Sequence, residues 1–340
     1  MATNAKNIAE LLNTDTTVKV GDIEDGSVTT AKLAASAVTT AKVADNAITS
    51  AKALNLGRRN ILYNGAMKIA QRGDVTNLTN GYTGCDRWKF DRSGSSAVVT
   101  GKQTGSGNMP QNGFPNAVHI DVTTADSSAA AGDLVLLRQY IESQDLQHLK
   151  FGTSSAESLT LSFWVKSSKT GTHWVEIYLY DANKVNSASY TVSSANTWEH
   201  KTLTFAGETS TAIPNDSTHG MVVQWWLKAG STYAGGTHPG NVWHLTSANR
   251  VPGQVNVMDS TDNNFYLTGV QLEVGDSASD FEHRSFGEEL ELCKRYYQKS
   301  FNYDTAPENG GGTGISFNGS VLGYCGSNNN GTFSGFHRFN

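Results

Sequence analysis

The chain has 340 residues, of which 38% are hydrophobic and 17% charged, and its 34 glycines favour an all-β protein with many turns. A net charge of -5, with no basic cluster in the sequence, gives no reason to expect binding to nucleic acid. No apolar run approaches about 18 residues, so the sequence predicts no insertion into a membrane.

Residues 3–13 are predicted to form a short helix with Ile8, Leu11 and Leu12 on one apolar stripe. A helix of about three turns is not stable alone in water, so this stripe needs a partner. It either bundles with its own copies or docks into another protein. We expect residues 1–24 to be an attachment segment, with these three apolar side chains making the contact.

Residues 25–54 contain three decapeptide repeats, which read Val-Thr-Thr-Ala-Lys-Leu, Val-Thr-Thr-Ala-Lys-Val and Ile-Thr-Ser-Ala-Lys-Ala in register. Repeats that each bury little apolar surface gain stability by stacking or by pairing with other chains. The pattern therefore predicts an intertwined shaft over residues 25–57, formed by a parallel homotrimer. A Thr/Ala-rich linker without fixed structure is the alternative. The apolar residues expected to carry trimerisation are Val28, Leu33, Val38, Val43 and Ile48.

The pattern over residues 58–284 indicates an antiparallel β-sandwich of the jelly-roll kind. Apolar and polar residues alternate over 159–166 and 174–180 with a turn between them, which predicts a hairpin of two paired strands. Gly, Asn and Ser clusters separate the remaining strands. These further strands are expected over 134–142, 198–205, 221–228 and 265–274.

Residues 285–340 form a last region, in which the sequence pattern differs from that of the predicted sandwich. A helix is predicted over 286–297, because acidic residues lead and basic residues follow, as the helix dipole favours. Short strands are predicted over 315–324 and 332–339. The sequence stops in a strand-like alternation without a terminating turn, so we expect the natural chain to continue further.

Four stretches are informative as a set. They are residues 4–13 with the repeats behind them, 60–73 with Asp86-Arg87-Trp88, 158–166, and 269–275 with 281–284 and 293–297. Together they resemble the tail fibre and receptor-binding proteins of tailed bacteriophages, and the layout is similar to carbohydrate-binding modules. The resemblance implies a homotrimeric virion protein, made in the host cytoplasm. Its N-terminus would hold a tail, baseplate or adaptor protein, and its distal domains would meet the host surface.

The expected fold class is therefore mainly β, in an elongated fibre. Its parts would be an N-terminal helix and repeat shaft, an antiparallel jelly-roll-like β-sandwich, a short helix and a C-terminal β segment.

Aromatic residues in the predicted sandwich suggest a sugar-binding face. Strand alternation sends Phe163 and Trp225 inward, and places other aromatics with polar neighbours on the opposite face. An aromatic ring can stack on the apolar side of a pyranose while polar groups take its hydroxyls. The same face could instead be buried by a loop, a second sheet or a subunit. The loop 229–241, with Tyr233 and His238, is a second candidate. The predicted carbohydrate-binding residues are Trp164, Trp174, Tyr178, Tyr180, Trp226, Lys166, Glu176 and Gln224.

No catalytic, metal-binding or cofactor motif stands out in the sequence. Asp86 and Asp91 could supply the two carboxylates of glycoside cleavage, but ion pairing beside Trp88 is the simpler interpretation. The three cysteines are scattered without metal-ligand spacing. We therefore predict a non-enzymatic fibre protein, without metal or cofactor, that mediates adsorption to host-surface glycans. The alternatives are a structural connector fibre whose recognition is carried elsewhere, and a glycan-cleaving tailspike.

Overall fold

The computed structural model describes residues 58–105, 109–110, 113–299 and 303. All of them belong to one compact unit, residues 57–340. Several predictions lie outside the described residues. They are the attachment helix with Ile8, Leu11 and Leu12, the shaft with Val28, Leu33, Val38, Val43 and Ile48, and the strands 315–324 and 332–339.

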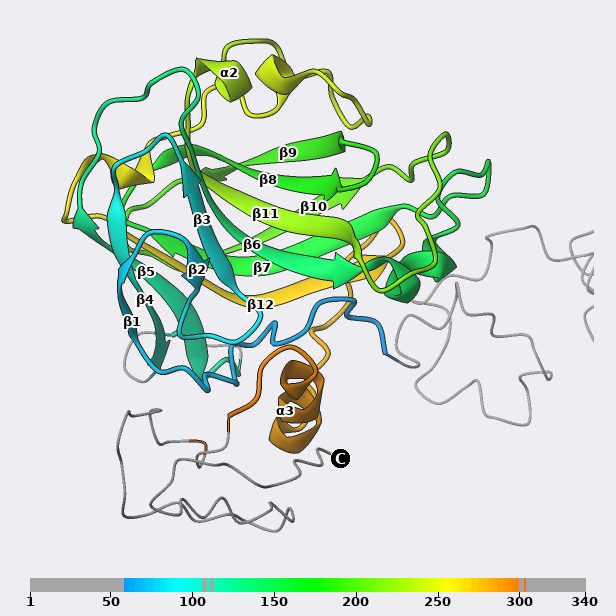
Figure 1. Ribbon diagram of the computed structural model, residues 1–340, viewed down its shortest axis with the longest axis horizontal. Helices are drawn as coiled ribbons and strands as arrows, with labels where there is room; N and C mark the ends of the chain where they lie inside the picture. The colour runs from blue at the N-terminus through cyan, green and yellow to red at the C-terminus, as the bar shows by residue number, and fades with distance from the viewer. Residues whose placement is uncertain (1–57, 106–108, 111–112, 300–302, 304–340) are drawn as a thin grey trace, which may run out of the picture. The chain divides into compact units, whose positions relative to one another are not determined.

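Two antiparallel sheets of six strands face each other (Figure 1). We call them the β7 sheet and the β8 sheet. The β7 sheet has the order β1 (Val75–Leu78), β4 (Val98–Gly105), β5 (Asn116–Thr124), β12 (Asn264–Val274), β7 (Leu159–Ser167) and β10 (Glu199–Phe205). The β8 sheet has the order β2 (Gly81–Tyr82), β3 (Lys89–Ser93), β6 (Leu134–Glu142), β11 (His219–Ala229), β8 (Gly171–Leu179) and β9 (Lys184–Val192).

These strands confirm the mainly β fold class and the antiparallel sandwich predicted from the alternation pattern. The four further strands expected between residues 134 and 274 correspond to β6, β10, β11 and β12, with bounds within two residues of the prediction. The helical elements are η4 (Ser143–Leu149), α2 (Ser231–Ala234), η5 (Ser247–Asn249), η6 (Val257–Asp259) and α3 (Phe286–Lys294).

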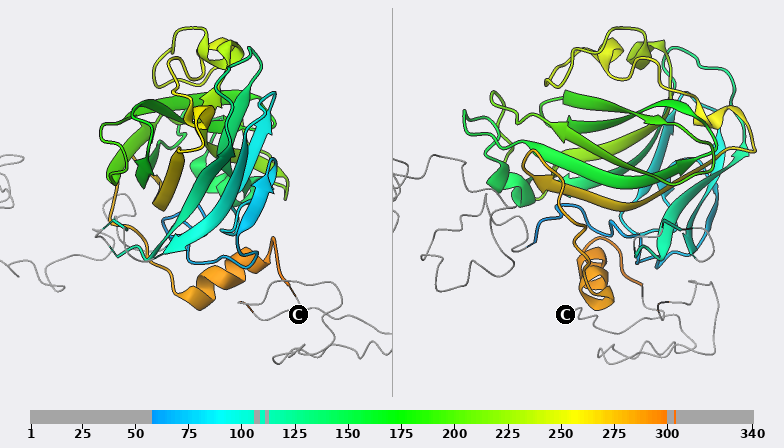
Figure 2. Two further views of the ribbon diagram at one scale, coloured as in Figure 1. Left: turned by 90° about the vertical axis from the view of Figure 1, so that its left-hand side faces the viewer. Right: turned by 180° about the vertical axis from the view of Figure 1, so that it is seen from behind.

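The helix α3 packs against the sandwich (Figures 1 and 2). Ser285 begins it, since its hydroxyl accepts a hydrogen bond from the Glu288 backbone N–H at 3.2 Å. The helix ends at Lys294, three residues earlier than predicted. Just beyond it, Arg295 donates to Glu142 at the end of β6 through two nitrogens, at 2.9 and 2.7 Å. The helix is thereby fixed to the β8 sheet.

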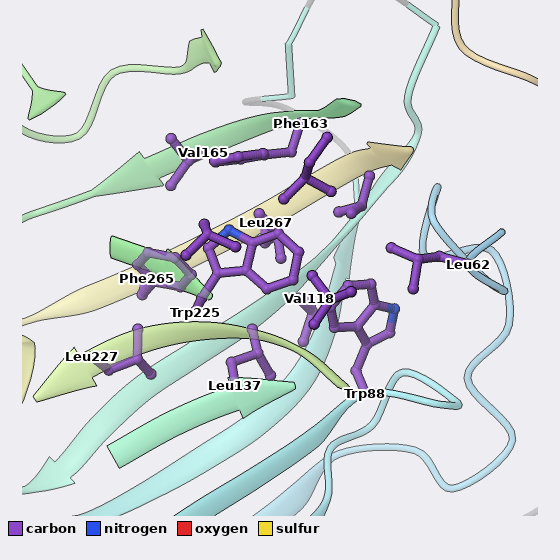
Figure 3. Packing of buried hydrophobic residues seen from close by; sticks show 14 of the residues in the cluster. Leu62, Trp88, Val118, Leu137, Phe163, Val165, Trp225, Leu227, Phe265 and Leu267 are labelled. Carbon is purple, nitrogen blue, oxygen red and sulfur yellow. The ribbon is translucent and has the colours of Figure 1, made fainter. Parts of the chain in front are cut away.

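The main core lies between the two sheets (Figure 3). Phe163 from β7 and Trp225 from β11 meet edge to face across the sandwich, with ring centroids 5.4 Å apart. Trp88 contacts the same Trp225 ring at 5.5 Å. All three rings are fully buried, and such pairs stabilise beyond their area burial by about 0.5–1.5 kcal/mol. The prediction that Phe163 and Trp225 face inward is confirmed.

The predicted hairpin of β7 and β8 is wrong. Strand β7 pairs with β10 and β12, whereas β8 pairs with β9 and β11, so residues 168–170 cross from one sheet to the other. Alternation cannot distinguish these outcomes, because both arrangements bury the same apolar face of each strand. Gly171 begins β8 with a φ of 116°, a conformation that favours glycine. The outward side chains of β7 and β8 therefore lie on opposite surfaces.

Candidate functional site

The eight predicted carbohydrate-binding residues are divided between two surfaces. Trp164 and Lys166 lie on the outer face of the β7 sheet, while the other six belong to the β8 sheet side. The expected platform that joined Trp164 to Trp174 does not exist, because their strands are in different sheets.

The outer face of the β8 sheet carries cross-strand rows of side chains, defined by the strand register. The polar row crosses five strands, and its members are Lys89, Arg138, Gln224, Glu176 and Ser187. Beside it runs the tyrosine row, whose members are Tyr140, Val222, Tyr178 and Val185. On the other side of the polar row, Leu136 pairs with Asp91 and with Trp226.

Residues 230–255, which we call the cover segment, bury the Trp226 side of this face. Val251 packs against Trp174 and Trp226, and the Tyr233 ring lies 5.3 Å from Trp226. Trp174 Nε1 donates to the Pro252 carbonyl oxygen at 3.1 Å. Trp226 is 0% and Trp174 5% exposed. Trp174 and Trp226 are therefore packing residues, and the prediction that they stack on a sugar is wrong. The alternative, in which a loop buries this part of the face, is correct for these two residues.

The cover segment is fixed to the sheet by a buried ion pair. Arg250 donates to both carboxylate oxygens of Glu176, through Nε at 2.8 Å and through Nη2. Ser187 Oγ and Gln224 Nε2 also donate to Glu176, which is 0% exposed. Although burial opposes the charge of Arg250, Glu176 raises the pKa of the guanidinium group. Glu176 was expected to contact sugar hydroxyls, but burial and these four donors make it a structural anchor.

A depression of about 270 Å³ remains open between the cover segment and strand β3. Tyr178 and Gln224 are the only predicted site residues in its lining. Its walls and floor are formed by Asn80, Asp91, Arg92, Ser93, Leu134, Leu136, Arg138, Tyr178, Gln224 and Arg250. We call this depression the groove.

Several polar atoms in the groove are already paired. Asp91 accepts from Arg138 Nε at 2.5 Å and lies 3.1 Å from Lys89 Nζ. Gln224 donates through Nε2, but its buried Oε1 has no hydrogen-bond partner within the described residues. An unpaired buried acceptor is costly, and this oxygen is closed to solvent in the structure.

The aromatic rings of the tyrosine row, with Tyr180 just beyond the end of β8, continue the outer face beside the groove. The Tyr178 and Tyr180 rings lie 5.8 Å apart, and Tyr180 is 48% exposed. His219 bridges the row, with its ring 6.0 Å from Tyr180 and 4.6 Å from Tyr140. Burial raises the pKa of Tyr140 to about 12, so its hydroxyl stays neutral and can donate a hydrogen bond at neutral pH.

Sequence reasoning missed much of the groove. Arg138 and Tyr140 alternate with inward residues of β6, so their outward direction could be read from the sequence. Their position opposite Gln224 and Val222 could not, because pairing between β6 and β11 joins residues about 85 apart in the chain. Arg250 belongs to a loop and carried no periodic signal.

The structure separates the two carboxylates considered for glycoside cleavage. Asp91 lines the groove, whereas Asp86 is buried elsewhere and accepts hydrogen bonds from Gln71 and Arg72. Each carboxylate is already paired with an arginine. Among the described residues there is no group of three or more His, Cys, Asp or Glu placed to hold a metal ion, and no helix long and apolar enough to cross a membrane.

No protein-family model and no curated protein matches the chain. Among solved structures, a putative sugar binding protein from Bacteroides thetaiotaomicron covers 64% of this chain and 100% of its own, at 11% identity and a TM-score of 0.34. The module TmCBM61, in complex with β-1,4-galactotriose, covers 64% of this chain and 99% of its own, at 11% identity and a TM-score of 0.32.

The enzymatically active domain of tailspike protein 4 from bacteriophage CBA120 covers 59% of this chain, at 12% identity and a TM-score of 0.32. The match spans 21% of that tailspike chain. Similarity at this level does not identify the function of a protein, which has to be inferred from its own residues.

Proposed function

We propose that the sandwich is a glycan-binding head and that the groove receives the sugar. The observation that carries this proposal is the open side of the β8 sheet, where the Tyr178 ring stands beside a row of hydrogen-bonding groups. A sugar presents an apolar ring face and polar hydroxyls together, and this combination matches such a surface. Tyr178 would stack on the ring, and Gln224 would lie beneath it in the lining of the groove.

The size of the groove limits the ligand. Its volume of about 270 Å³ is just below the range of about 300–1,000 Å³ that is usual for small-molecule pockets. One or two sugar rings would therefore contact it, and single-site affinity would be modest. Several heads presented together would raise the overall affinity.

The test compares two aromatic substitutions in the full-length protein. We expect Tyr178→Ala to weaken binding to host-envelope glycans about fivefold to tenfold, since one stacked ring contributes on the order of 1 kcal/mol. The matched control is Trp164→Ala on the β7 sheet, which should bind as the parent does. Binding that is lost with Trp164→Ala and kept with Tyr178→Ala, in variants with parental melting temperatures, would place the site on the other face.

We further propose that the protein is a bacteriophage tail fibre, located in the virion and acting without catalysis. Support comes from the repeats over residues 25–54 and from the resemblance in sequence. Three chains would wind together over residues 25–57, and residues 1–24 would attach to a tail, baseplate or adaptor protein. Light scattering should give a trimer, and a stable monomer at micromolar concentration would refute the shaft. Deleting residues 1–24 should leave a folded trimer that no longer assembles onto fibreless particles.

A connector fibre is the second candidate. The observation that favours it is the burial of Trp174 and Trp226, which removes two rings from the predicted binding face. A connector would bind no host glycan, so the same binding assay distinguishes the two functions. Glycan cleavage has less support, because Asp86 and Asp91 do not share the groove.

A further inference from the structure

The groove differs in charge from the chain as a whole. The chain has a net charge of -5, yet the outer face at the groove and the polar row beneath it carries three cations and two carboxylates. The cations are Lys89, Arg138 and Arg250, and the carboxylates are Asp91 and Glu176. Glu176 lies beneath Arg250 and is fully buried, so Asp91 is the carboxylate that lines the groove.

Both carboxylates are already neutralised by arginine, while the arginines keep further donors. Arg138 donates to Asp91 through Nε, and within the described part of the chain its two terminal nitrogens are not used in this ion pair. Arg250 uses Nε and Nη2 for Glu176 and keeps Nη1. Arg92 also lines the groove, but it pairs in register with the core residue Val135, and its Nη1 donates to the Ala97 carbonyl oxygen, so its guanidinium group is not directed to the outer face. The unused N–H donors in the groove are therefore largely cationic.

Two of these guanidinium groups are held in place before any ligand arrives. The Arg138 guanidinium lies 5.0 Å from the Tyr140 ring and is fixed by Asp91. The Arg250 guanidinium lies 5.6 Å from the Tyr178 ring and is fixed by Glu176. A donor group that is already ordered loses little conformational entropy on binding, and a guanidinium fork matches the geometry of carboxylate and phosphate.

We propose that the groove selects an acidic sugar, whose carboxylate or phosphate group is bound by Arg138 together with Arg250. This inference rests on the proposed glycan-binding function and specifies its ligand class. The sugar ring would lie against Tyr178 and above Gln224, and the anionic group would face the side of β3 and β6. Charge-assisted hydrogen bonds of this kind are about twice as strong as neutral ones, so the acidic group contributes to both affinity and selectivity.

The test uses matched oligosaccharides and the full-length protein. A neutral oligosaccharide, its uronic acid counterpart and its phosphorylated counterpart are titrated at 0.05 and 0.5 M salt, both experimental settings chosen to span roughly the range over which screening changes. We expect one or both acidic forms to bind at least about tenfold more tightly than the neutral form at low salt. The difference in affinity between the acidic and neutral forms should become smaller at high salt. Comparison of the uronic acid and the phosphorylated oligosaccharide then shows which anion is preferred.

Substitutions assign the selectivity to the groove. Arg138→Gln should abolish most of the preference for the acidic form while leaving weak binding of the neutral form. Arg138→Lys is the second variant, should Arg138→Gln lower the melting temperature, because it keeps a cation beside Asp91 but removes the guanidinium fork and with it most of the preference. The control is Lys102→Gln on the β7 sheet, where Lys102 pairs with Asp121 at 3.2 Å, and it should keep the full preference.

Two kinds of result would overturn the inference, and they have different consequences for the proposed glycan-binding function. Equal binding of neutral and acidic forms, or an acidic preference that survives both arginine substitutions, would refute acidic selectivity while leaving the glycan-binding function intact. Absence of binding to all three oligosaccharides and to host-envelope glycans would refute the proposed function itself, and the inference with it.

Discussion

The two outer faces of the sandwich both carry aromatic and basic side chains, but they use them differently. On the β7 sheet these groups partner one another. His119 stacks on Tyr266 at 4.0 Å, and Lys166 Nζ lies 4.2 Å from the Tyr266 ring and 5.2 Å from the Trp198 ring. On the β8 sheet the cover segment rises above the strands and leaves a groove beside it.

This difference shows what distinguishes a sheet face that carries a groove from one that carries only paired aromatic rings. On the β7 face the aromatic rings and the Lys166 cation contact one another. A wall is needed to exclude water on one side of a ligand, and the cover segment supplies it by burying Trp174 and Trp226. Trp174 and Trp226 therefore support the cover segment, while Tyr178 and Tyr140 beside it remain partly exposed.

The largest expected difference between the faces is in stability. Trp226→Ala should lower the free energy of unfolding by about 3–5 kcal/mol, because it empties a fully buried site beneath the cover segment. Trp164→Ala, at a half-buried position on the β7 face, should cost about 1 kcal/mol or less. Urea denaturation of both variants measures the two values. Similar losses would contradict the distinction between a covered and an open surface.

A smaller effect is expected from the ion pair that fixes the cover segment. Arg250→Ala leaves the buried Glu176 carboxylate without its cation and should cost about 3 kcal/mol. Lys150→Ala is the control, since its pair with Glu157 is exposed and should contribute less than about 1 kcal/mol. Limited proteolysis should also show faster cleavage within residues 230–255 in the Arg250 variant. Unchanged cleavage would mean that the apolar contacts alone hold the segment.

The smallest effect concerns pH and the β7 face. Burial lowers the pKa of His119, so the folded chain binds a proton on this histidine only at a lower pH than the unfolded chain, where the pKa is about 6.5. This contribution to stability is present above pH 6.5 and is lost as the pH falls toward the lower folded pKa. We expect His119→Gln to reduce the loss of stability between pH 7.5 and 5.5 by roughly 1 kcal/mol or less. An identical pH slope in the variant would show that this histidine is not shielded.

The sequence predicted the local features of the sandwich well. Alternation identified the strands and placed Phe163 and Trp225 inside, because the two-residue period of a strand is a local property. It could not assign β7 and β8 to different sheets, since pairing depends on contacts far apart in the chain. The groove was only partly predicted for the same reason. Tyr178 and Gln224 were found, but Arg138 reaches them through strand pairing and Arg250 through a loop.

The strand order also has a consequence for how the chain is made. The last strand of the sandwich, β12, is a middle strand that joins β5 to β7. Until it has been synthesised, the β7 sheet exists as two separate halves with open hydrogen-bonding edges. Roughly 100 residues separate β7 from β12, which at about 5–20 residues per second corresponds to roughly 5–20 s of translation. A ribosome that stalls before residue 274 therefore leaves two unpaired edges, which are the usual sites of aggregation.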